Sequence, residues 1–556
     1  MIDCNCQNNS FVIFVILKDR NINNVHMKSI FFTFVMTLSY FSLSGQNNTI
    51  LWGGEYDDRG YYSIIGSTGD ALFVERKYNT YLNNRDVDIE LLRFDNEMEI
   101  THGVELRDLE RSSYESIATI NSPEGLAHIY YQTTKKGKQV ISAQLFEHEA
   151  LRKTDIIDLT EFKIMSRSDQ MVRQDGNYQF DYPLDIILSR DRSKMAIFYD
   201  QEKAGKNRKN YYQYCVIDIN NGFSILYKGD FFSDERSDKY LMSDRHLSNS
   251  GKLTYAIKRY VKKNNTEHIN KRPAYDYEIH HMTGDTTEYI YDIKVKKQYL
   301  DNLTLGSDDE DNLYIAGYLR KQPWGDIKRS FLLSLDNLGY DRFKVTDEYS
   351  RRDVKKIEGK EDNELDDNFK TIDIYPTDDI VYIVRQYRRR GSRNNNFNNV
   401  GGFGMNRMNT FNDLIYFWNY EDVVVEGVGK NTGDILWTAV NPRRHEDDNT
   451  YSRYFISGQI ELINNNLVLI YNEREENIVR IRRKENLKRT DIPGDRTSIT
   501  LATIDSNGGI NYQVLEDEDH FHLPERGAFY NNKRLYFLNH HKNYKRFVAG
   551  MTTLDF

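Results

Sequence analysis

Four aspartates stand out because their spacing would let them act together on one substrate. Asp185, Asp244, Asp301 and Asp373 each lie a few residues before a turn sequence rich in Ser, Asp, Asn and Gly. Two facing carboxyl groups can serve as general acid and base on a glycoside, or they can bind a cation. Arg245 and His246 follow the second aspartate directly, so we expect them beside it as binding groups. The alternative is that these polar residues only hydrate a central channel.

Two further sets of residues have the chemistry of metal ligands. Asp308, Asp309 and Asp311 belong to the run DDED, and their oxygens could hold Ca²⁺; because the alternating D-x-D-x-D spacing is missing, a solvated turn is the favoured alternative. His520 and His522 flank one phenylalanine, so in a strand both rings would point the same way, as two ligands could. Capping of an acidic turn is the alternative for this pair. Apart from a possible Ca²⁺, we expect no cofactor.

An arginine-rich segment, 385–411, reads RQYRRRGSRNNNFNNVGGFGMNRMNTF. Its low complexity predicts a long loop insertion, and its arginines could recognise an acidic protein or an anionic polysaccharide. A solvated insertion without a ligand is the alternative. A second charged insertion, 351–368, is expected to be a linker. The arginines proposed as binding residues are Arg388, Arg389, Arg390 and Arg393.

The elements that must position these residues are repeated strand–turn–strand units. A short apolar strand, a polar turn and a strand rich in Leu, Ile, Tyr and Phe recur eight times, and most copies are followed by a second hairpin. Four strands per unit predict an all-β fold, a β-propeller with eight four-stranded blades, with seven as the alternative. The eighth unit lacks one strand, which residues 49–56 (TILWGGEY) can supply from the N-terminal end. The sequences of the eight first turns are GSTGDALFVE (66–75), NSPEGLAHIYY (121–131), SRDRSKMAIFYD (189–200), SNSGKLTYAIK (248–258), GSDDEDNLYIAG (306–317), YPTDDIVYIV (375–384), NNNLVLIYN (464–472) and YNNKRLYFLN (530–539).

Two units resemble known propeller repeats. GSDDEDNLYIAGYL (306–319) resembles the D-x-x-G-N-x-Y-x-x-G repeat of secreted bacterial propellers, with Asp311 in place of the usual glycine. KNTGDILWTAV (430–440) is similar to the T-G-x-x-x-W repeat of quinoprotein-like propellers, with Thr432, Gly433 and Trp437 in place. Each resemblance covers one unit of eight. Together they imply the fold and no quinone chemistry.

The N-terminus resembles an export signal. Residues 27–45 carry a basic residue, an apolar run and small residues, which is the pattern of a secretory signal peptide. Residues 1–26 are interpreted as an upstream extension outside the translated protein, and residues 46–556 as one propeller domain. Cleavage would leave Cys215 as the single thiol, so no internal disulfide is expected. A membrane anchor is the alternative interpretation of this segment; beyond it, no apolar stretch approaches a membrane span.

Composition narrows the function classes. The 556 residues have a formal net charge of −9 and 13% aromatic residues, which excludes a disordered chain and argues against binding to nucleic acid. The local motifs G-x-S-x-G and H-E-x-x-H are absent. We therefore expect an exported protein, periplasmic, secreted or attached to the cell surface. It would bind a protein or glycan of the cell envelope or extracellular space through its loops; the alternative is a glycoside hydrolase or lyase using the aspartates above.

Overall fold

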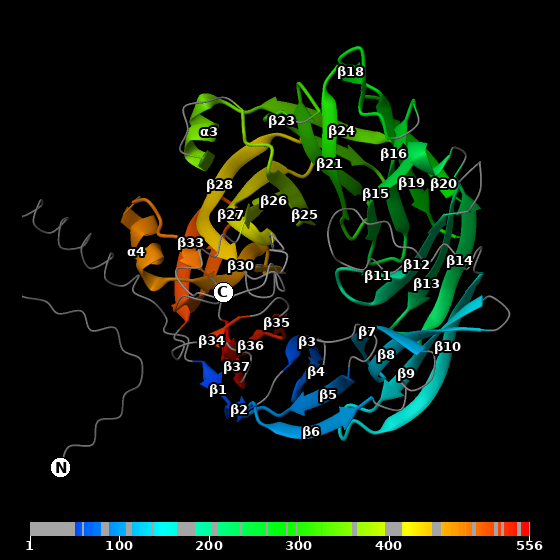
Figure 1. Cartoon of the computed structure of the whole chain (residues 1–556), viewed down its shortest axis with the longest axis vertical. Coiled ribbons are helices and arrows are strands. Elements are labelled where there is room, and N and C mark those ends of the chain that lie inside the picture. Colours follow the sequence, from blue (N-terminus) through cyan, green and yellow to red (C-terminus); the bar gives the residue numbers. More distant parts are fainter. Residues whose placement is uncertain are drawn as a thin grey trace, which may run out of the picture. The chain divides into compact units, whose positions relative to one another are not determined.

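The computed structural model shows an all-β chain whose described residues form eight four-stranded antiparallel blades of a β-propeller. These blades belong to one unit, Asn48–Phe556, and follow one another around a ring in sequence order (Figure 1). The expected upstream extension and signal peptide lie outside the described residues. The segments that the structure does not describe are 1–49, 58–59, 79–87, 107–113, 135–137, 164–183, 203–208, 234–235, 263–264, 285–286, 296, 324, 359–363, 395–413, 448–457, 484, 492–495, 516–520, 524–526, 542–545 and 555–556.

The first four blades are regular meanders in which each strand pairs with the next along the chain. Blade 4 alone among them carries an extra hairpin, β17 (His268–Ile269) with β18 (Arg272–Pro273). A short 3-10 helix, η2 (Ser237–Lys239), precedes it. The strands are β3 (Tyr61–Ser67), β4 (Leu72–Tyr78), β5 (Asp88–Phe94) and β6 (Ile100–Glu105) in blade 1; β7 (Tyr114–Ser122), β8 (Gly125–Thr133), β9 (Lys138–Phe146) and β10 (Lys153–Lys163) in blade 2; β11 (Leu184–Leu188), β12 (Lys194–Glu202), β13 (Asn210–Asp218) and β14 (Ser224–Phe232) in blade 3; β15 (Tyr240–Leu247), β16 (Leu253–Tyr260), β19 (Tyr275–Met282) and β20 (Thr287–Ile293) in blade 4.

Blades 5 to 8 carry the larger additions. Helix α3 (Arg351–Glu358) lies between blades 5 and 6 in sequence, and helix α4 (Glu475–Arg483) lies inside blade 7. The short strand β31 (Thr490–Asp491) adds in parallel to the outer strand of blade 6. The strands are β21 (Tyr299–Ser307), β22 (Leu313–Arg320), β23 (Ile327–Leu335) and β24 (Asp341–Glu348) in blade 5; β25 (Phe369–Pro376), β26 (Ile380–Asn394), β27 (Leu414–Gly429) and β28 (Ile435–Asp447) in blade 6; β29 (Gln459–Ile463), β30 (Asn466–Glu473), β32 (Ser498–Ile504) and β33 (Ile510–Leu515) in blade 7; β34 (Phe521–His522), β35 (Ala528–Asn531), β36 (Arg534–His541) and β37 (Arg546–Thr553) in blade 8.

The ring is closed by the N-terminal strand, as the sequence predicted. In blade 8, β34 and β35 both pair with β36 and together take the place of the first strand. Strands β1 (Leu51–Trp52) and β2 (Tyr56–Asp57) both pair antiparallel with β37 and together form the fourth strand. The amide of Gly53 donates to the carbonyl of Ala549 at 2.9 Å. The N-terminal segment therefore forms the outer strand of blade 8 and is held within the sheet of the last blade.

The strand order divides the connections between two faces. Because neighbouring strands are antiparallel, the turns after the first and third strands of a blade emerge on one face, which we call the turn face. The connections after the second and fourth strands emerge on the other, which we call the loop face. Both helices, the hairpin β17–β18 and the segments 164–183 and 395–413 belong to connections of the loop face. The insertions of this chain are therefore gathered on one side.

Short turns are possible because particular residues accept left-handed backbone. The turn between β29 and β30 uses Asn464 (φ 48°) and Asn465 (φ 62°), and the turn between β35 and β36 uses Asn532 (φ 49°) and Lys533 (φ 64°). Two consecutive positive φ values define the tight turn that suits the twist of a hairpin. Asp311 (φ 62°) also has this conformation, which explains why glycine is usual at its position in the resembling repeat.

Neighbouring turns are joined by polar contacts on the turn face. The amide of Asn249 donates to Asp309 at 2.9 Å, linking blades 4 and 5. Asn531 donates to the Ser67 hydroxyl at 3.0 Å, which links blade 8 to blade 1. These contacts confirm that the first turns of successive blades lie on one face.

The core lies between neighbouring blades, and among the described residues its largest side chains are mostly tyrosines. Ten of the twelve largest fully buried side chains are tyrosines. Tyr255, for example, stacks on Phe231 at 5.2 Å and on His280 at 4.9 Å between ring centroids. The high tyrosine content of the sequence therefore fills the space between blades, where a large ring contributes more contact area than an aliphatic side chain.

Two segments differ from the expectation of irregular insertions. The charged segment 351–368 begins with helix α3, because Val354 and Ile357 pack into a buried cluster against blades 5 and 6. The arginine-rich segment 385–411 begins as a continuation of β26, which runs to Asn394. Composition alone did not reveal either element. Among the described residues, no helix is long and apolar enough to cross a membrane.

Closure generates a test on Trp52. Its ring packs over Gly550, so closely that a Cβ added to this glycine would come within 2.4 Å of the indole, and it lies beside the core of blades 7 and 8. Replacing Trp52 with Ala removes this contact and should lower the free energy of unfolding by about 2 kcal/mol. The control is Leu51→Ala in the same strand, where a side chain of a 46% exposed residue should matter by less than about 0.5 kcal/mol. Equal effects in denaturant titrations would show that the strand does not latch the ring through Trp52.

Candidate functional site

Three of the four predicted aspartates lie at one level of the ring. Asp185 in β11, Asp244 in β15 and Asp373 in β25 occupy equivalent places in the first strands of blades 3, 4 and 6. Asp301 does not share this level, because it lies three residues further from the turn than Thr304, which occupies the equivalent place in blade 5. The partners in register are Phe198, Ala256 and Val384 for the three aspartates, Ala316 for Thr304 and Tyr318 for Asp301.

Asp301 belongs to a different set of charges. It lies 3.5 Å from the guanidinium of Arg320, a residue that is 3% exposed. Arg320 also donates to the carbonyl of Gly325 at 3.1 Å. Asp301 therefore balances a buried cation of its own blade.

The turn Ser189–Ser193 of blade 3 reaches across the ring to Asp373. Its residue Arg190 forms an ion pair with Asp373 at 3.5 Å and also donates to the carbonyl of Ile374. The guanidinium lies 4.4 Å from the centroid of the Tyr375 ring. Blade 6 thus holds an arginine that comes from blade 3.

Arg192, from the same turn, contacts blades 1 and 8. It donates to the carbonyl of Ile65 in blade 1 at 3.3 Å and lies 4.7 Å above the ring of Phe529 in blade 8. The amide of Asp191 donates to Asn249 in blade 4 at 3.1 Å. One five-residue turn therefore contacts blades 1, 4, 6 and 8, and we call it the crossing turn.

Asp244 and its neighbours are the part of the site in which pKa values are shifted most strongly. Asp244 accepts a hydrogen bond from the amide of Leu305 at 2.7 Å, and burial, with a contribution from Asp373, raises its pKa to about 6. The Arg245 guanidinium instead pairs with Asp185 at 3.2 Å. The carboxyl group of Asp244 is therefore partly protonated near pH 6.

His246, which the sequence also singled out, is a neutral hydrogen-bonding group. Its Nε2 lies 2.8 Å from the hydroxyl of Ser307. Burial and the nearby Arg190 lower the pKa of His246 to about 3. At neutral pH the imidazole therefore carries no charge, and it positions the first strands of blades 4 and 5 against each other.

Sequence reasoning missed Arg190, Arg192 and Glu461. Glu461 in β29 has a raised pKa because of burial, with Asp373 adding repulsion and the two arginines opposing it. The sequence did contain a signal for Arg190 and Arg192. The first turn of blade 3 reads SRDRSK, with two arginines where the other first turns have mainly Gly, Asn, Asp and Ser.

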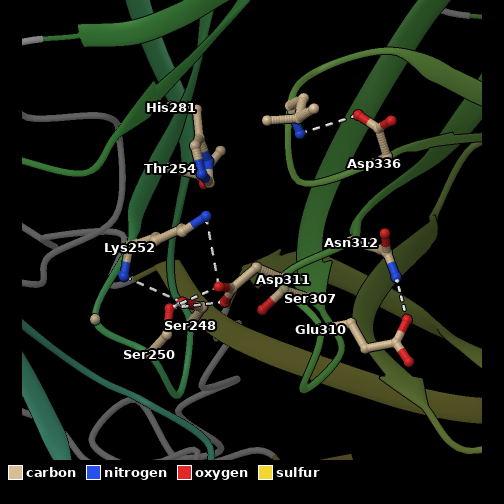
Figure 2. A network of polar contacts seen from close by, with 12 residues as sticks. Ser248, Ser250, Lys252, Thr254, His281, Ser307, Glu310, Asp311, Asn312 and Asp336 are labelled. Carbon is tan, nitrogen blue, oxygen red and sulfur yellow. Dashed lines mark hydrogen bonds and ion pairs between the residues drawn. The ribbon is translucent and has the colours of Figure 1, made fainter.

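The acidic run proposed for Ca²⁺ is engaged by groups of the chain itself. Asp308 accepts from the amide and side chain of Asn312 and from Lys430 at 3.1 Å, and these contacts lower its pKa despite burial. Asp311 accepts from Ser250 at 2.8 Å and lies 3.5 Å from Lys252 (Figure 2). Within the described residues, no group of three or more His, Cys, Asp or Glu is placed to hold a metal ion.

The histidine pair and the arginines are only partly described. His520 lies outside the described residues, and His522 pairs in register with His540. Arg388 and Arg389 lie in β26, where the Arg388 guanidinium stands 5.3 Å from the Tyr420 ring and Arg389 is exposed. Arg390 and Arg393 continue the same strand, so all four belong to a sheet and not to a loop.

Comparison with known proteins identifies no family. No family model and no curated protein matches the chain. Solved structures that align include an acylaminoacyl peptidase of Pyrococcus horikoshii (8% identity, TM-score 0.34, covering 86% of this chain and 58% of that one). A second is the WD40 domain of SCAP from fission yeast (6% identity, TM-score 0.32, covering 90% of this chain and 98% of that one). A third is a polysaccharide lyase, an ulvan lyase (10% identity, TM-score 0.33, covering 83% of this chain and 95% of that one). At these scores the alignments carry no argument about function.

Asp244 allows a direct test of the site's electrostatics. Its pKa is raised on folding from 3.8 to about 6, so the folded state prefers the protonated form and the wild type loses stability as pH rises from about 4 to 7. Asp244→Asn keeps an oxygen to accept from Leu305 and should remove this loss, making the variant more stable at pH 8 by about 1–2 kcal/mol.

The measurement is denaturant unfolding of both proteins at several pH values. The control is Asp309→Asn, the same change at an exposed aspartate of the turn face, which should leave the pH dependence parallel to that of the wild type. Parallel curves for Asp244→Asn would contradict the raised pKa.

Proposed function

We propose that this protein is an exported β-propeller that binds a protein or glycan of the cell envelope or extracellular space through its loop face. The observation that carries the proposal is topological. The helices, the extra hairpin and the long connections belong to the loop face, while the turn face has short turns locked to one another. Binding sites are commonly built from loops on a rigid scaffold, and here the closed ring is that scaffold.

The contacts at the centre of the ring agree with this assignment of ligand binding to the loop face. The crossing turn places Arg190 against Asp373, and Arg245 pairs with Asp185, so two carboxylates have counter-ions from the chain. Such pairs join blades to one another. The loop face presents exposed charged side chains that could contact a ligand, among them Arg351 on α3 and Arg483 on α4.

A second candidate function is hydrolysis or elimination of a polysaccharide by these carboxylates. The observation that favours it is the raised pKa of Asp244 beside the ion-paired Asp373. A buried carboxyl group with a raised pKa can act as the general acid in such a reaction.

Site-specific blocking tests the binding proposal. In the chain 46–556 the single cysteine, Cys215, is fully buried, so one introduced cysteine can be coupled selectively to a large polyethylene glycol maleimide. A label at Arg351→Cys or Arg483→Cys should weaken binding to the ligand found on a glycan array or in an envelope pull-down by about tenfold or more. A label at Leu338→Cys, an exposed site of the turn face, should leave it unchanged. The reverse pattern, or no ligand in either screen, would refute the proposal.

Substitution of Asp244 tests the catalytic candidate. If the protein cleaves a polysaccharide, Asp244→Asn should lower the release of new chain ends by roughly 100-fold or more while the fold is retained. Asp301→Asn is the matched control, because that aspartate lies at another level and pairs with Arg320. Equal activity of both variants would eliminate Asp244 as the acid.

A further inference from the structure

Three turns on the turn face share one backbone geometry. In blades 1, 5 and 7, the turn after the third strand begins with an aspartate whose carboxylate accepts from the amides two and four residues further on. The residue between those two has left-handed backbone in each turn, with φ of 62°, 86° and 79°. The three turns are 95–99 (DNEME), 336–340 (DNLGY) and 505–509 (DSNGG).

The turn of blade 5 differs from the other two in what it exposes. It holds Leu338 and Tyr340 at positions where blade 1 has two glutamates and blade 7 has an asparagine and a glycine. Leu338 is 63% exposed and Tyr340 is 69% exposed. Since the same backbone forms with acidic or small polar residues, the fold does not require these two apolar side chains in solvent.

The blades on either side add further exposed apolar residues. Gly339 packs on the ring of Tyr289 in blade 4, so closely that an added Cβ would lie 2.8 Å from it, and the next residue, Ile290, is 56% exposed. In blade 6, the turn after the third strand packs in the same way on β24 of blade 5, and Leu436 after this turn is 55% exposed. We call the four exposed residues the apolar rim: Ile290, Leu338, Tyr340 and Leu436.

Leu436 also occupies a position that accepts a polar residue. It is the extra residue of a bulge in β28, between the pairs Gly427–Trp437 and Val428–Ile435. The corresponding bulges hold Thr101 in blade 1, Leu226 in blade 3 and Arg342 in blade 5. The bulge therefore does not demand a leucine at this place.

The turns beside the apolar rim carry mostly negative charge. The four turns of blades 5 and 6 on this face contain nine carboxylates and one lysine. They lie together, because Lys430 of blade 6 pairs with Asp308 of blade 5 at 3.1 Å and its amide donates to the carbonyl of Asp379 at 2.9 Å. The four turns are 308–311 (DDED), 336–341 (DNLGYD), 377–379 (TDD) and 430–434 (KNTGD).

Cations balance only part of this charge. Besides Lys430, Lys252 of blade 4 lies 3.5 Å from Asp311. Arg342 donates to a tyrosine hydroxyl of its own blade at 2.9 Å, and Lys344 lies 5.6 Å from the centroid of a phenylalanine ring there. Among the described residues, the remaining carboxylates of the four turns form no ion pair. The surface therefore has an excess of negative charge.

We propose that the apolar rim is a second interaction surface, which binds a basic amphipathic segment of a partner protein. Exposed apolar side chains that gather on one surface, with a tyrosine among them, are typical of protein interfaces. The surrounding carboxylates favour a partner whose apolar side chains are flanked by lysine or arginine. This surface lies on the turn face, so the inference goes beyond the ligand proposed for the loop face.

A second copy of the chain and a lipid surface fit this site less well. Two copies that met through the apolar rim would bring the same carboxylates against each other, and like charges across an interface are costly. Anionic lipid headgroups would be repelled for the same reason. A neutral lipid surface would leave the carboxylates beside it without cations.

The test measures binding of the chain 46–556 to a fluorescent amphipathic peptide of leucine and lysine. A peptide with glutamate in place of lysine is the comparison. The variant Leu338→Glu/Tyr340→Glu reproduces the residues of the blade 1 turn, so its fold should be retained. It removes two apolar side chains and adds two negative charges. We expect it to bind the leucine–lysine peptide about tenfold more weakly or worse, whereas attraction by charge alone would make binding tighter.

Two further variants complete the design. The matched control Val261→Glu/Val479→Glu makes the same change at two exposed valines outside the apolar rim, and it should bind at least as tightly as the wild type. Asp379→Asn/Asp434→Asn removes two carboxylates beside the rim. It should weaken binding by about threefold or more at low ionic strength, and by less at high ionic strength.

The inference is overturned if the wild type does not bind the leucine–lysine peptide or binds the leucine–glutamate peptide equally well. Equal or tighter binding by Leu338→Glu/Tyr340→Glu also overturns it. Sedimentation of the wild type, alone and with phosphatidylcholine vesicles, tests the other occupants. A dimer or a vesicle complex that this variant loses would overturn the inference in favour of self-association or a lipid surface.

The two proposals fail separately. A polyethylene glycol label at Leu338→Cys should block the leucine–lysine peptide and leave the loop-face ligand bound, and a label at Arg351→Cys should do the opposite. If only the Arg351→Cys label blocks the peptide, the inference about the apolar rim is overturned and the proposed function stands. If the Leu338→Cys label blocks the peptide and no ligand of the loop face is found, the apolar rim is supported and the proposed function fails.

Discussion

The pairing of β1 and β2 with β37 is the contact on which the rest of the structure depends. A four-stranded antiparallel sheet is apolar on both faces in this protein, so each blade is stable only between two neighbours. In a ring every blade packs between two neighbours, provided that the first and last blades are joined. Joining them through backbone hydrogen bonds within one sheet couples the N-terminal strand to the whole molecule.

Closure then separates rigid parts from variable ones. The turn face is stiffened by contacts between successive turns and by the crossing turn, whose arginines reach blades 1, 6 and 8. The loop face accepts helices, a hairpin and the long strand pair β26–β27 without changing the order of the strands. Blade 6 shows both properties in one sheet, because the buried pair of Arg385 and Glu426 fixes it internally while the same two strands continue outward.

The centre of the ring shows how one fold can place similar residues in different electrostatic states. Asp185 and Asp373 each face an arginine, whereas Asp244 accepts a backbone hydrogen bond and has a pKa raised to about 6. The difference arises from their neighbours on other blades, since the three aspartates occupy the same level of their own strands. The raised pKa of Asp244 is the reason for retaining catalysis as the second proposed function beside binding.

The sequence by itself determined the architecture. Eight turn signals, the alternation of strands and the missing strand of the last unit predicted the blades and the closure of the ring. This was possible because turn chemistry and strand periodicity act over a few residues. It also placed Asp185 and Asp244 at one level. Asp301 lies at another level because it is six residues before the end of its strand, whereas Asp185 and Asp244 are three residues before the ends of theirs. Only the tertiary structure brought Arg190 and Arg192 to distant blades and turned part of a low-complexity segment into strand, because contacts across a ring join residues far apart in the chain.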